Sequence, residues 1–153
     1  MGVRILNGDA LAMLRTLDAK SVQCVVTSPP YFQLRDYGVD GQIGLEQTPV
    51  AFLDALVAVF REVRRVLRDD GVCFVNLGDS YAGSGKGPSK SHNAPTGGAN
   101  PHSMGLNPGY VPFGMRAKSL MLIPERFAIA MADDGWIVRS QIVWAKKSAM
   151  PES

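Results

Sequence analysis

The sequence predicts an α/β protein built on a parallel sheet, with one long loop. Short apolar segments alternate along the chain with segments of helical periodicity. The segment SVQCVV, residues 21–26, is apolar on both faces, which is typical of a central strand in a parallel sheet. With 153 residues the chain has the length of one ordinary domain, so we expect residues 1–153 to form a single domain.

The first elements predict a β-α-β unit. An apolar segment at residues 3–6 ends at the turn sequence NGD. Leu11, Leu14 and Leu17 follow at helical spacing, and the strand at 21–26 comes next. Strand, short helix and strand within about thirty residues is the pattern of two parallel strands joined by a helix.

Residues 48–71 carry the clearest helical pattern in the chain. Thr48 can cap this helix, Pro49 suits its first turn, and Gly71 is expected to end it. Its apolar residues form one stripe: Val50, Leu53, Leu56, Val57, Phe60, Val63 and Leu67. The charged residues that we expect at its solvated C-terminal end are Arg64, Arg65, Arg68, Asp69 and Asp70. A further buried strand is predicted at residues 72–76.

Residues 82–118 are rich in Gly, Ser, Pro and Asn and show no period, which predicts a long flexible loop. His92 and His102 lie in this loop without acidic or cysteine neighbours, so we expect no metal site. After the loop, the pattern predicts a helix at residues 124–135 and a strand at 136–144.

Composition sets broad limits on function. The formal net charge of +2 is too small to indicate a nucleic-acid partner by itself. No apolar run is long enough to span a membrane and no signal-peptide pattern is visible, so we expect a cytoplasmic protein. Cys24 and Cys73 lie in apolar segments, and we expect two buried free thiols rather than a disulfide or a metal pair.

The sequence TSPPY, residues 27–31, directly follows the strand at 21–26. In an open parallel sheet, ligands bind at the carboxyl ends of the strands. Ser28 and Pro29 each precede a proline and are driven into an extended conformation, and neither proline has an amide hydrogen to donate. The result is a rigid set of carbonyl oxygens with one hydroxyl and one aromatic plane, Tyr31, which suits a planar ring that carries an exocyclic amine. The alternative is a rigid turn in which Tyr31 is an ordinary half-buried aromatic residue.

TSPPY resembles the catalytic motif of amino-group DNA methyltransferases, (Asp/Asn/Ser)-Pro-Pro-(Tyr/Phe/Trp). Five other segments resemble successive parts of the permuted class of this family, in which the catalytic motif lies near the N-terminus: LRDYGVDGQIGLE (34–46), VFREVRRVLRDDG (59–71), NLGDSY (76–81), LIPERFA (122–128) and GWIVRSQIVWAKKSAMPES (135–153). The resemblance implies a Rossmann-like sheet of an S-adenosylmethionine-dependent methyltransferase, with helices on both faces.

The resemblance also implies a reaction and a role for each residue of the motif. Enzymes of this family flip the target base out of the duplex and methylate its exocyclic amine with S-adenosylmethionine. Ser28 and the carbonyl group of Pro29, followed by Pro30, would hold the amine, and Tyr31 would stack on the flipped base. Thr27 and Ser28 would also lie against the cofactor. Serine at the first position of the motif favours cytosine N4 over adenine N6.

Two acidic residues outside the motif have two interpretations each. Asp9 matches the family's acidic residue near the adenine of the cofactor, but it can equally cap the helix that follows it. Asp79 follows a predicted strand, so it either faces the cleft in a binding role or completes a turn.

The family's Phe-x-Gly-x-Gly motif, which binds the methionine part of the cofactor, is absent from this chain. Residues 83–87 contain spaced glycines but lack the flanking strand and helix that such a loop needs. We therefore expect an incomplete sheet of low activity, whose free edges pair with a missing C-terminal segment or a second chain. The alternatives are a non-catalytic DNA-binding subunit without the cofactor motif, and an RNA or protein methyltransferase with a similar motif.

Double-stranded DNA is the partner that the resemblance implies. Phosphate neutralisation by basic side chains would then make binding fall steeply with salt. The basic residues that we expect on the DNA side are Arg35, Lys86, Lys90, Arg116, Lys118, Lys146 and Lys147. For any one of these residues the alternative is an ordinary solvated surface charge.

Overall fold

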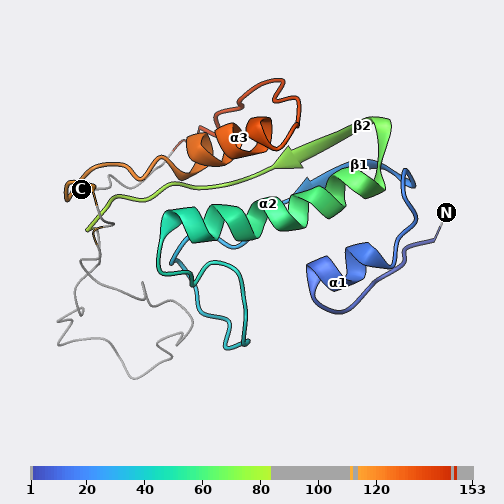
Figure 1. The fold of residues 1–153 in the computed structure, drawn as a ribbon, viewed down its shortest axis with the longest axis horizontal. Coiled ribbons are helices and arrows are strands. Elements are labelled where there is room, and N and C mark those ends of the chain that lie inside the picture. The colour runs from blue at the N-terminus through green and yellow to red at the C-terminus, as the bar shows by residue number, and fades with distance from the viewer. Residues whose placement is uncertain (1, 84–110, 112–113, 146, 148–153) are drawn as a thin grey trace.

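The computed structural model describes residues 2–83, 111, 114–145 and 147 (Figure 1). Its elements, in chain order, are α1 (Ala10–Arg15), β1 (Val22–Thr27), α2 (Pro49–Val66), β2 (Leu67–Val75) and α3 (Ile123–Asp133). The α/β class and the approximate positions of all three helices and of both of these strands are confirmed. Among the described residues, no helix is both long and apolar enough to cross a lipid bilayer.

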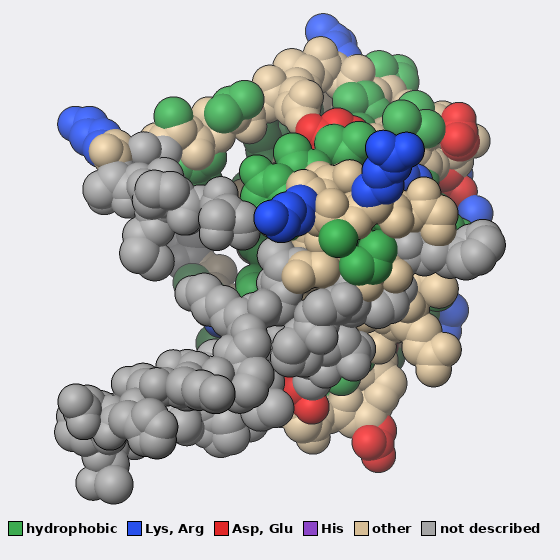
Figure 2. Space-filling view, turned by 90° about the vertical axis from the view of Figure 1, so that its left-hand side faces the viewer, with side chains coloured by type: hydrophobic (Ala, Val, Ile, Leu, Met, Phe, Trp, Pro, Cys, Tyr) green, Lys and Arg blue, Asp and Glu red, His purple; other side chains and the backbone are tan. Residues whose placement is uncertain are grey.

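The two strands lie side by side and run parallel, and α2 forms the crossover between them. Val25 is in register with Cys73 and Thr27 with Val75. Because the strands are parallel, both carboxyl ends lie at the same end of the sheet, on the left in Figure 1 and toward the viewer in Figure 2. The segments that follow the strands, beginning at Ser28 and Asn76, therefore start next to each other.

Helix α2 begins where the sequence predicts but ends earlier. Thr48 Oγ1 accepts a hydrogen bond from the Ala51 amide (3.2 Å), and Pro49 occupies the first turn. The predicted end at Gly71 is wrong, because Leu67 already has extended backbone angles and is in register with Val22 of β1. Pairing with β1 is a contact between distant parts of the chain, and it takes precedence over the local helical pattern.

The residues after the helix consequently belong to β2 and not to a solvated helix end. Asp69 accepts a hydrogen bond from Lys20 Nζ at 2.8 Å, across from the start of β1. Asp70 pairs with Arg68 at 3.2 Å. All four side chains are exposed, so these ion pairs contribute little to stability.

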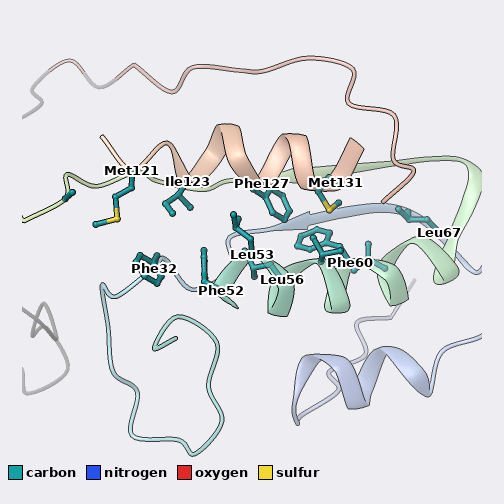
Figure 3. Packing of buried hydrophobic residues seen from close by; sticks show 13 residues of the cluster. Phe32, Phe52, Leu53, Leu56, Phe60, Leu67, Met121, Ile123, Phe127 and Met131 are labelled. Carbon is teal, nitrogen blue, oxygen red and sulfur yellow. The ribbon is translucent and has the colours of Figure 1, made fainter. Parts of the chain in front are cut away.

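The hydrophobic core lies where α2 faces α3 and the sheet (Figure 3). Phe60 of α2 packs edge-on against Phe127 of α3, with 5.1 Å between the ring centroids. Phe32, the residue after the TSPPY sequence, packs against Phe52 at the start of α2, with 5.4 Å between centroids. Through this pair the core fixes the segment that follows TSPPY.

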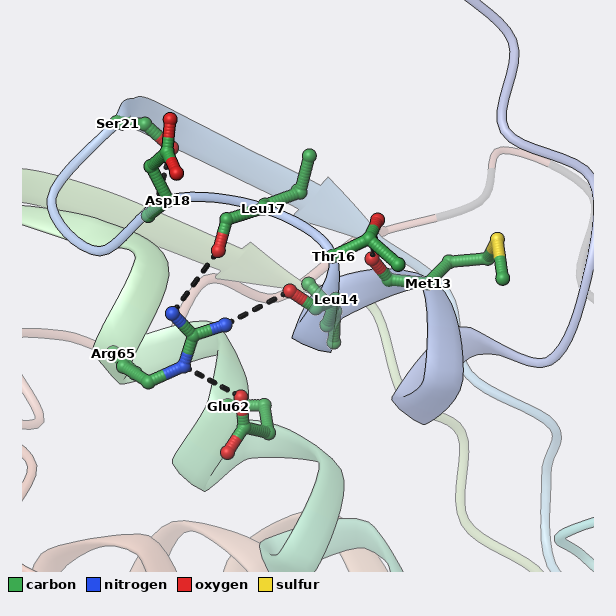
Figure 4. A network of polar contacts seen from close by, with 8 residues as sticks. All are labelled: Met13, Leu14, Thr16, Leu17, Asp18, Ser21, Glu62 and Arg65. Atoms are coloured by element: carbon green, nitrogen blue, oxygen red, sulfur yellow. Dashed lines mark hydrogen bonds and ion pairs between the residues drawn. The ribbon is translucent and has the colours of Figure 1, made fainter.

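Arg65 of α2 holds the C-terminal end of α1 (Figure 4). Its guanidinium donates hydrogen bonds to the carbonyl oxygens of Leu14 (2.9 Å) and Leu17 (3.0 Å), and pairs with Glu62 (2.6 Å). At the other end of α1, Asp9 Oδ1 accepts a hydrogen bond from the Ala12 amide at 2.9 Å. The capping role that we considered for Asp9 is therefore confirmed.

Two segments predicted as strands, residues 3–6 and 136–144, have no regular secondary structure. A strand is stabilised by hydrogen bonds to a neighbour, and β1 and β2 form a two-stranded sheet in the described part of the chain.

The prediction that Cys24 is buried is also wrong, since the sheet face that carries it is open to solvent. Cys73 is partly buried, and both thiols are free as expected. The expected second layer of helices is not formed by the described residues.

Candidate functional site

The SPPY motif, Ser28–Tyr31, follows directly from the last residue of β1. Thr27 is still in register with Val75, and its carbonyl oxygen accepts a hydrogen bond from the Asn76 amide at 2.9 Å. Ser28 is exposed, whereas the two prolines and Tyr31 are partly buried. The strand end therefore presents the Ser28 hydroxyl to solvent at the end of the sheet where ligands bind.

Tyr31 lies against the backbone of Gly78, in the segment that follows β2. A Cβ atom at position 78 would lie 2.6 Å from Cε2 and 3.0 Å from Cδ2 of the Tyr31 ring. Such a distance is a severe overlap, so only glycine allows the ring to occupy this position. The contact joins the end of β1 to the end of β2 and fixes the aromatic plane.

Gly44 holds the same motif from another direction. Its φ of 108° is strained for other residues, and a Cβ atom there would lie 3.1 Å from the carbonyl oxygen of Tyr31 and 3.2 Å from Cβ of Pro30. The Gln33 amide donates to the Gly44 carbonyl (2.7 Å), and the Gly44 amide donates to the carboxylate of Glu46 (2.8 Å). The loop after the motif thus folds back against it.

Asp79 connects the end of β2 to the start of α3. Its two carboxylate oxygens accept hydrogen bonds from the amides of Leu122 (2.9 Å) and Ile123 (3.1 Å). Asp79 thereby supplies acceptors at a helix start where Leu122, the residue at the cap position, makes no side-chain hydrogen bond of its own. This is a structural role across 43 residues of sequence, different from the local turn that we considered.

A pocket of about 40 Å³ lies between these groups, lined among others by Tyr31, Gly78, Asp79 and Ile123. This volume is sufficient for ordered water molecules beside the Tyr31 ring. Ser28, the first residue of the motif, is exposed.

The structure says less about the other predicted site residues. Asp9 is exposed at the start of α1, and this helix runs in the opposite direction to the strands in Figure 1. Within the described residues, no group of three or more metal-ligating side chains is found. His92, His102, Lys86, Lys90 and Lys146 lie outside the described residues, as does most of the glycine run 83–87.

The described basic residues of the predicted DNA side are all exposed: Arg35, Arg116, Lys118 and Lys147. Arg35 follows the motif closely, and its carbonyl oxygen accepts a hydrogen bond from Gln42 Nε2 at 2.9 Å. On the face that the carboxyl ends of the strands share, lysine and arginine side chains lie among hydrophobic and uncharged groups, with acidic side chains nearby (Figure 2).

Sequence reasoning located the motif but missed the two glycines that hold it. Gly78 lies in the segment NLGDSY and Gly44 in the segment QIGLE, and each contacts the motif only in the folded chain. The one signal available was that each glycine lies in a segment noted for its resemblance to the methyltransferases.

Comparison with known proteins gives a consistent result. Residues 22–153 match a family model described as DNA methylase, N6_N4_Mtase. The chain is 51% identical to the Type II methyltransferase M.XycI of Xanthomonas campestris pv. cyanopsidis, over 99% of this chain and 49% of that protein. It is 48% identical to M.Cfr9I of Citrobacter freundii and 42% identical to M.SmaI of Serratia marcescens, again over 49% and 50% of those proteins. No solved structure gives a significant match.

The chain therefore spans about half the length of the curated relatives that it matches. The family match covers more than half of the chain and includes β1, the SPPY motif and every later element. On this evidence the chain belongs to the N6_N4_Mtase family of DNA methylases.

Proposed function

We propose that this chain supplies the base-holding part of a site-specific DNA methyltransferase that transfers a methyl group from S-adenosylmethionine to cytosine N4. The observation that carries the proposal is the SPPY motif at the carboxyl end of β1, held in place by Gly78 and Gly44. The relatives' designation as Type II methyltransferases supports a role in restriction-modification.

The motif provides fixed acceptors for an amine. The hydroxyl of Ser28 and the carbonyl oxygen of Pro29 would accept hydrogen bonds from the exocyclic amine, which increases electron density on its nitrogen and orients the lone pair. Tyr31, fixed by Gly78, would stack on the flipped base, a contact worth about 1–3 kcal/mol. No residue forms a covalent bond to the base, so positioning and electrostatics account for catalysis.

The described residues fit one part of a cofactor site. Asp9 has a carboxylate oxygen that makes no helix-cap bond and could accept a hydroxyl or amine hydrogen of the nucleoside, and Thr27 and Ser28 lie at the strand end. When bound, S-adenosylmethionine supplies an electrophilic methyl group. The glycine motif that holds its methionine part in the family does not occur in these 153 residues.

Cytosine and adenine present the same amine geometry to the motif, so geometry does not distinguish the two bases. Serine at position 28 is the basis for proposing cytosine. Double-stranded DNA is the proposed substrate. Its phosphates would be bound by Arg35, Lys118 and Lys147, which are exposed. Lys86, Lys90 and Lys146, which lie outside the described residues, are proposed to contribute as well. Binding that weakens steeply as salt rises would support this part of the proposal.

The test is the methylation rate of this chain, co-expressed with the part of M.XycI that it does not match. Ser28→Ala should lower kcat about 100-fold, as loss of one charge-stabilising group does in other enzymes. Tyr31→Ala should raise KM for DNA about 10- to 100-fold, the equivalent of one lost base stack. Ser21→Ala and Tyr37→Ala change an exposed serine and tyrosine outside the motif and should leave both constants unchanged.

Equal effects of motif and control variants would refute the proposal. Full DNA affinity with no methylation would indicate a binding subunit.

A further inference from the structure

Arg65 connects α2 to the segment that leads from α1 into β1 (Figure 4). Its Nη2 donates a hydrogen bond to the Leu14 carbonyl at 2.9 Å, and its Nη1 donates to the Leu17 carbonyl at 3.0 Å. The carbonyl oxygen of Arg65 accepts a hydrogen bond from the Lys20 amide at 3.0 Å. One residue of α2 therefore holds three points of this segment.

Glu62, one turn earlier on α2, fixes the orientation of the guanidinium. Its Oε2 accepts a hydrogen bond from Arg65 Nε at 2.6 Å, and the two side chains are only 24% and 36% exposed. With Nε held by this carboxylate, Nη1 and Nη2 are directed at the two carbonyl oxygens. A guanidinium is a rigid planar group, whereas a lysine has a single nitrogen and cannot make all three bonds.

Helix α1 has few other contacts that determine its position. None of its six residues is buried, and residues 2–9 before it are all exposed. Leu14 is partly buried against the hydrophobic core. A helix this short is not stable by itself in water, so its position depends on Leu14 and on the hydrogen bonds from Arg65.

Asp9 lies at the opposite end of the same helix. Its Oδ1 accepts a hydrogen bond from the Ala12 amide, and its carbonyl oxygen accepts one from the Met13 amide, both at 2.9 Å. These bonds attach Asp9 to α1. Because the helix is only about 9 Å long, a shift of its C-terminal end moves Asp9 as well.

Arg65 is too far from the SPPY motif to contact the base. It lies just before Leu67, which is in register with Val22 at the amino end of β1. The motif begins after Thr27, at the other end of this strand, about 16 Å away. Any role of Arg65 in the reaction must therefore be indirect.

We propose that Arg65 is a positioning residue for cofactor binding. By holding Leu14 and Leu17 it fixes α1, and through α1 it fixes the carboxylate of Asp9. The inference rests on the proposed function, in which Asp9 binds the nucleoside part of S-adenosylmethionine. Without these hydrogen bonds α1 takes up other positions, and the apparent affinity for the cofactor falls with the fraction of molecules in which Asp9 is in place.

Arg65→Lys keeps the positive charge but cannot make all three bonds. In the complex co-expressed with the unmatched half of M.XycI, it should accelerate hydrogen exchange at the α1 amides at least about tenfold, the equivalent of one lost hydrogen bond to a charged group. The Kd for S-adenosylmethionine, measured by equilibrium dialysis, should rise about tenfold if Asp9 is then in place in about a tenth of the molecules. The KM for DNA should stay unchanged.

Arg68→Lys is the matched control. Arg68 is exposed and pairs with Asp70 at 3.2 Å, with no contact to α1 in this pair. The substitution should change neither the hydrogen exchange of α1 nor the Kd for the cofactor.

A double-variant comparison distinguishes positioning from general stabilisation. Asp9→Asn keeps the helix cap, because asparagine caps as well as aspartate, but it removes the carboxylate and should raise the Kd about tenfold or more. If Arg65 acts through Asp9, adding Arg65→Lys to Asp9→Asn should raise the Kd by less than about a further twofold.

An unchanged Kd in Arg65→Lys, even with faster exchange in α1, would overturn the inference. Equal effects of Arg65→Lys and Arg68→Lys, or independent effects of Arg65→Lys and Asp9→Asn, would overturn it as well. Methylation is measured separately. A complex that shows these differences in cofactor binding but methylates nothing would refute the proposed function and leave this inference standing, and a complex that binds no cofactor would refute both.

Discussion

The ring of Tyr31 lies so close to Gly78 that a single added carbon atom would be 2.6 Å from it. This contact joins the SPPY motif at the end of β1 to the segment after β2, and it determines the position of the aromatic plane proposed to bind the base. A substitution of Gly78 therefore tests the position of the Tyr31 ring.

Gly78→Ala should displace Tyr31 and lower methylation by the co-expressed complex, with an effect similar to that of Tyr31→Ala. The overlap should also destabilise the chain by about 1–3 kcal/mol, as overpacking usually does. Gly2→Ala is the control, because its Cβ would meet no atom within 4 Å. Methylation rates and thermal unfolding of both variants check the prediction, and an active, stable Gly78→Ala protein would contradict the observed contact.

Gly44→Ala should disturb the motif through its backbone. Gly44 and Gly38 both have positive φ, but only at Gly44 would a Cβ crowd the carbonyl of Tyr31 and the ring of Pro30. Gly38→Ala should therefore cost about 1–2 kcal/mol of conformational strain without loss of methylation. Gly44→Ala should cause the same conformational strain and, in addition, a loss of methylation. If the two variants behave alike in the methylation assay, contact with the motif is not what Gly44 provides.

Asp79→Ala should loosen α3, because the amides of Leu122 and Ile123 both donate to this carboxylate. Removal of comparable caps costs about 1–2 kcal/mol. Asp54→Ala, at an exposed position on α2, should change stability by less than about 0.5 kcal/mol. Hydrogen exchange at the start of α3 should accelerate in Asp79→Ala and not in Asp54→Ala. Unchanged exchange there would show that the cap is dispensable.

The Cys73 thiol should make stability depend on pH in alkaline solution. Burial, assisted by Cys24, raises its pKa from 9.0 to about 11 in the folded chain. Above about pH 9 the unfolded chain releases this proton while the folded chain retains it, so the free energy of unfolding should fall as pH rises toward 11. Below pH 9 the thiol is protonated in both states and contributes no pH dependence.

Urea unfolding at about pH 8 and about pH 10.5 should show a smaller decline for Cys73→Ala than for the unmodified chain. Cys24→Ala should retain most of the decline, because burial is the larger cause of the shift. Identical pH dependence in all three proteins would mean that other groups account for it.

The helices could be predicted because their signals are local. Thr48, Pro49 and a continuous apolar stripe define α2 within its own sequence, and the position of the SPPY motif followed from the apolar strand before it. The end of α2 could not be predicted in the same way. It depends on the pairing of Leu67 with Val22, which lie far apart in the chain.

The remaining errors have the same physical origin. Residues 3–6 and 136–144 have the composition of strands, but a strand forms only where a neighbour supplies hydrogen bonds. Cys24 has an apolar sequence context, but its burial requires a second layer that the described residues do not form. Gly44 and Gly78 act through contacts with Pro30 and Tyr31 that no local pattern records.

The most direct test of the proposed function is the identity of the methylated base. The chain is co-expressed with the unmatched half of M.XycI, incubated with S-adenosylmethionine and unmethylated duplex DNA, and the DNA is digested to nucleosides for mass spectrometry. We expect N4-methylcytosine, and we expect its amount to fall sharply in the Ser28→Ala complex. N6-methyladenine would contradict the assignment of the base, and the absence of any methylated nucleoside from a well-formed complex would contradict the proposed activity.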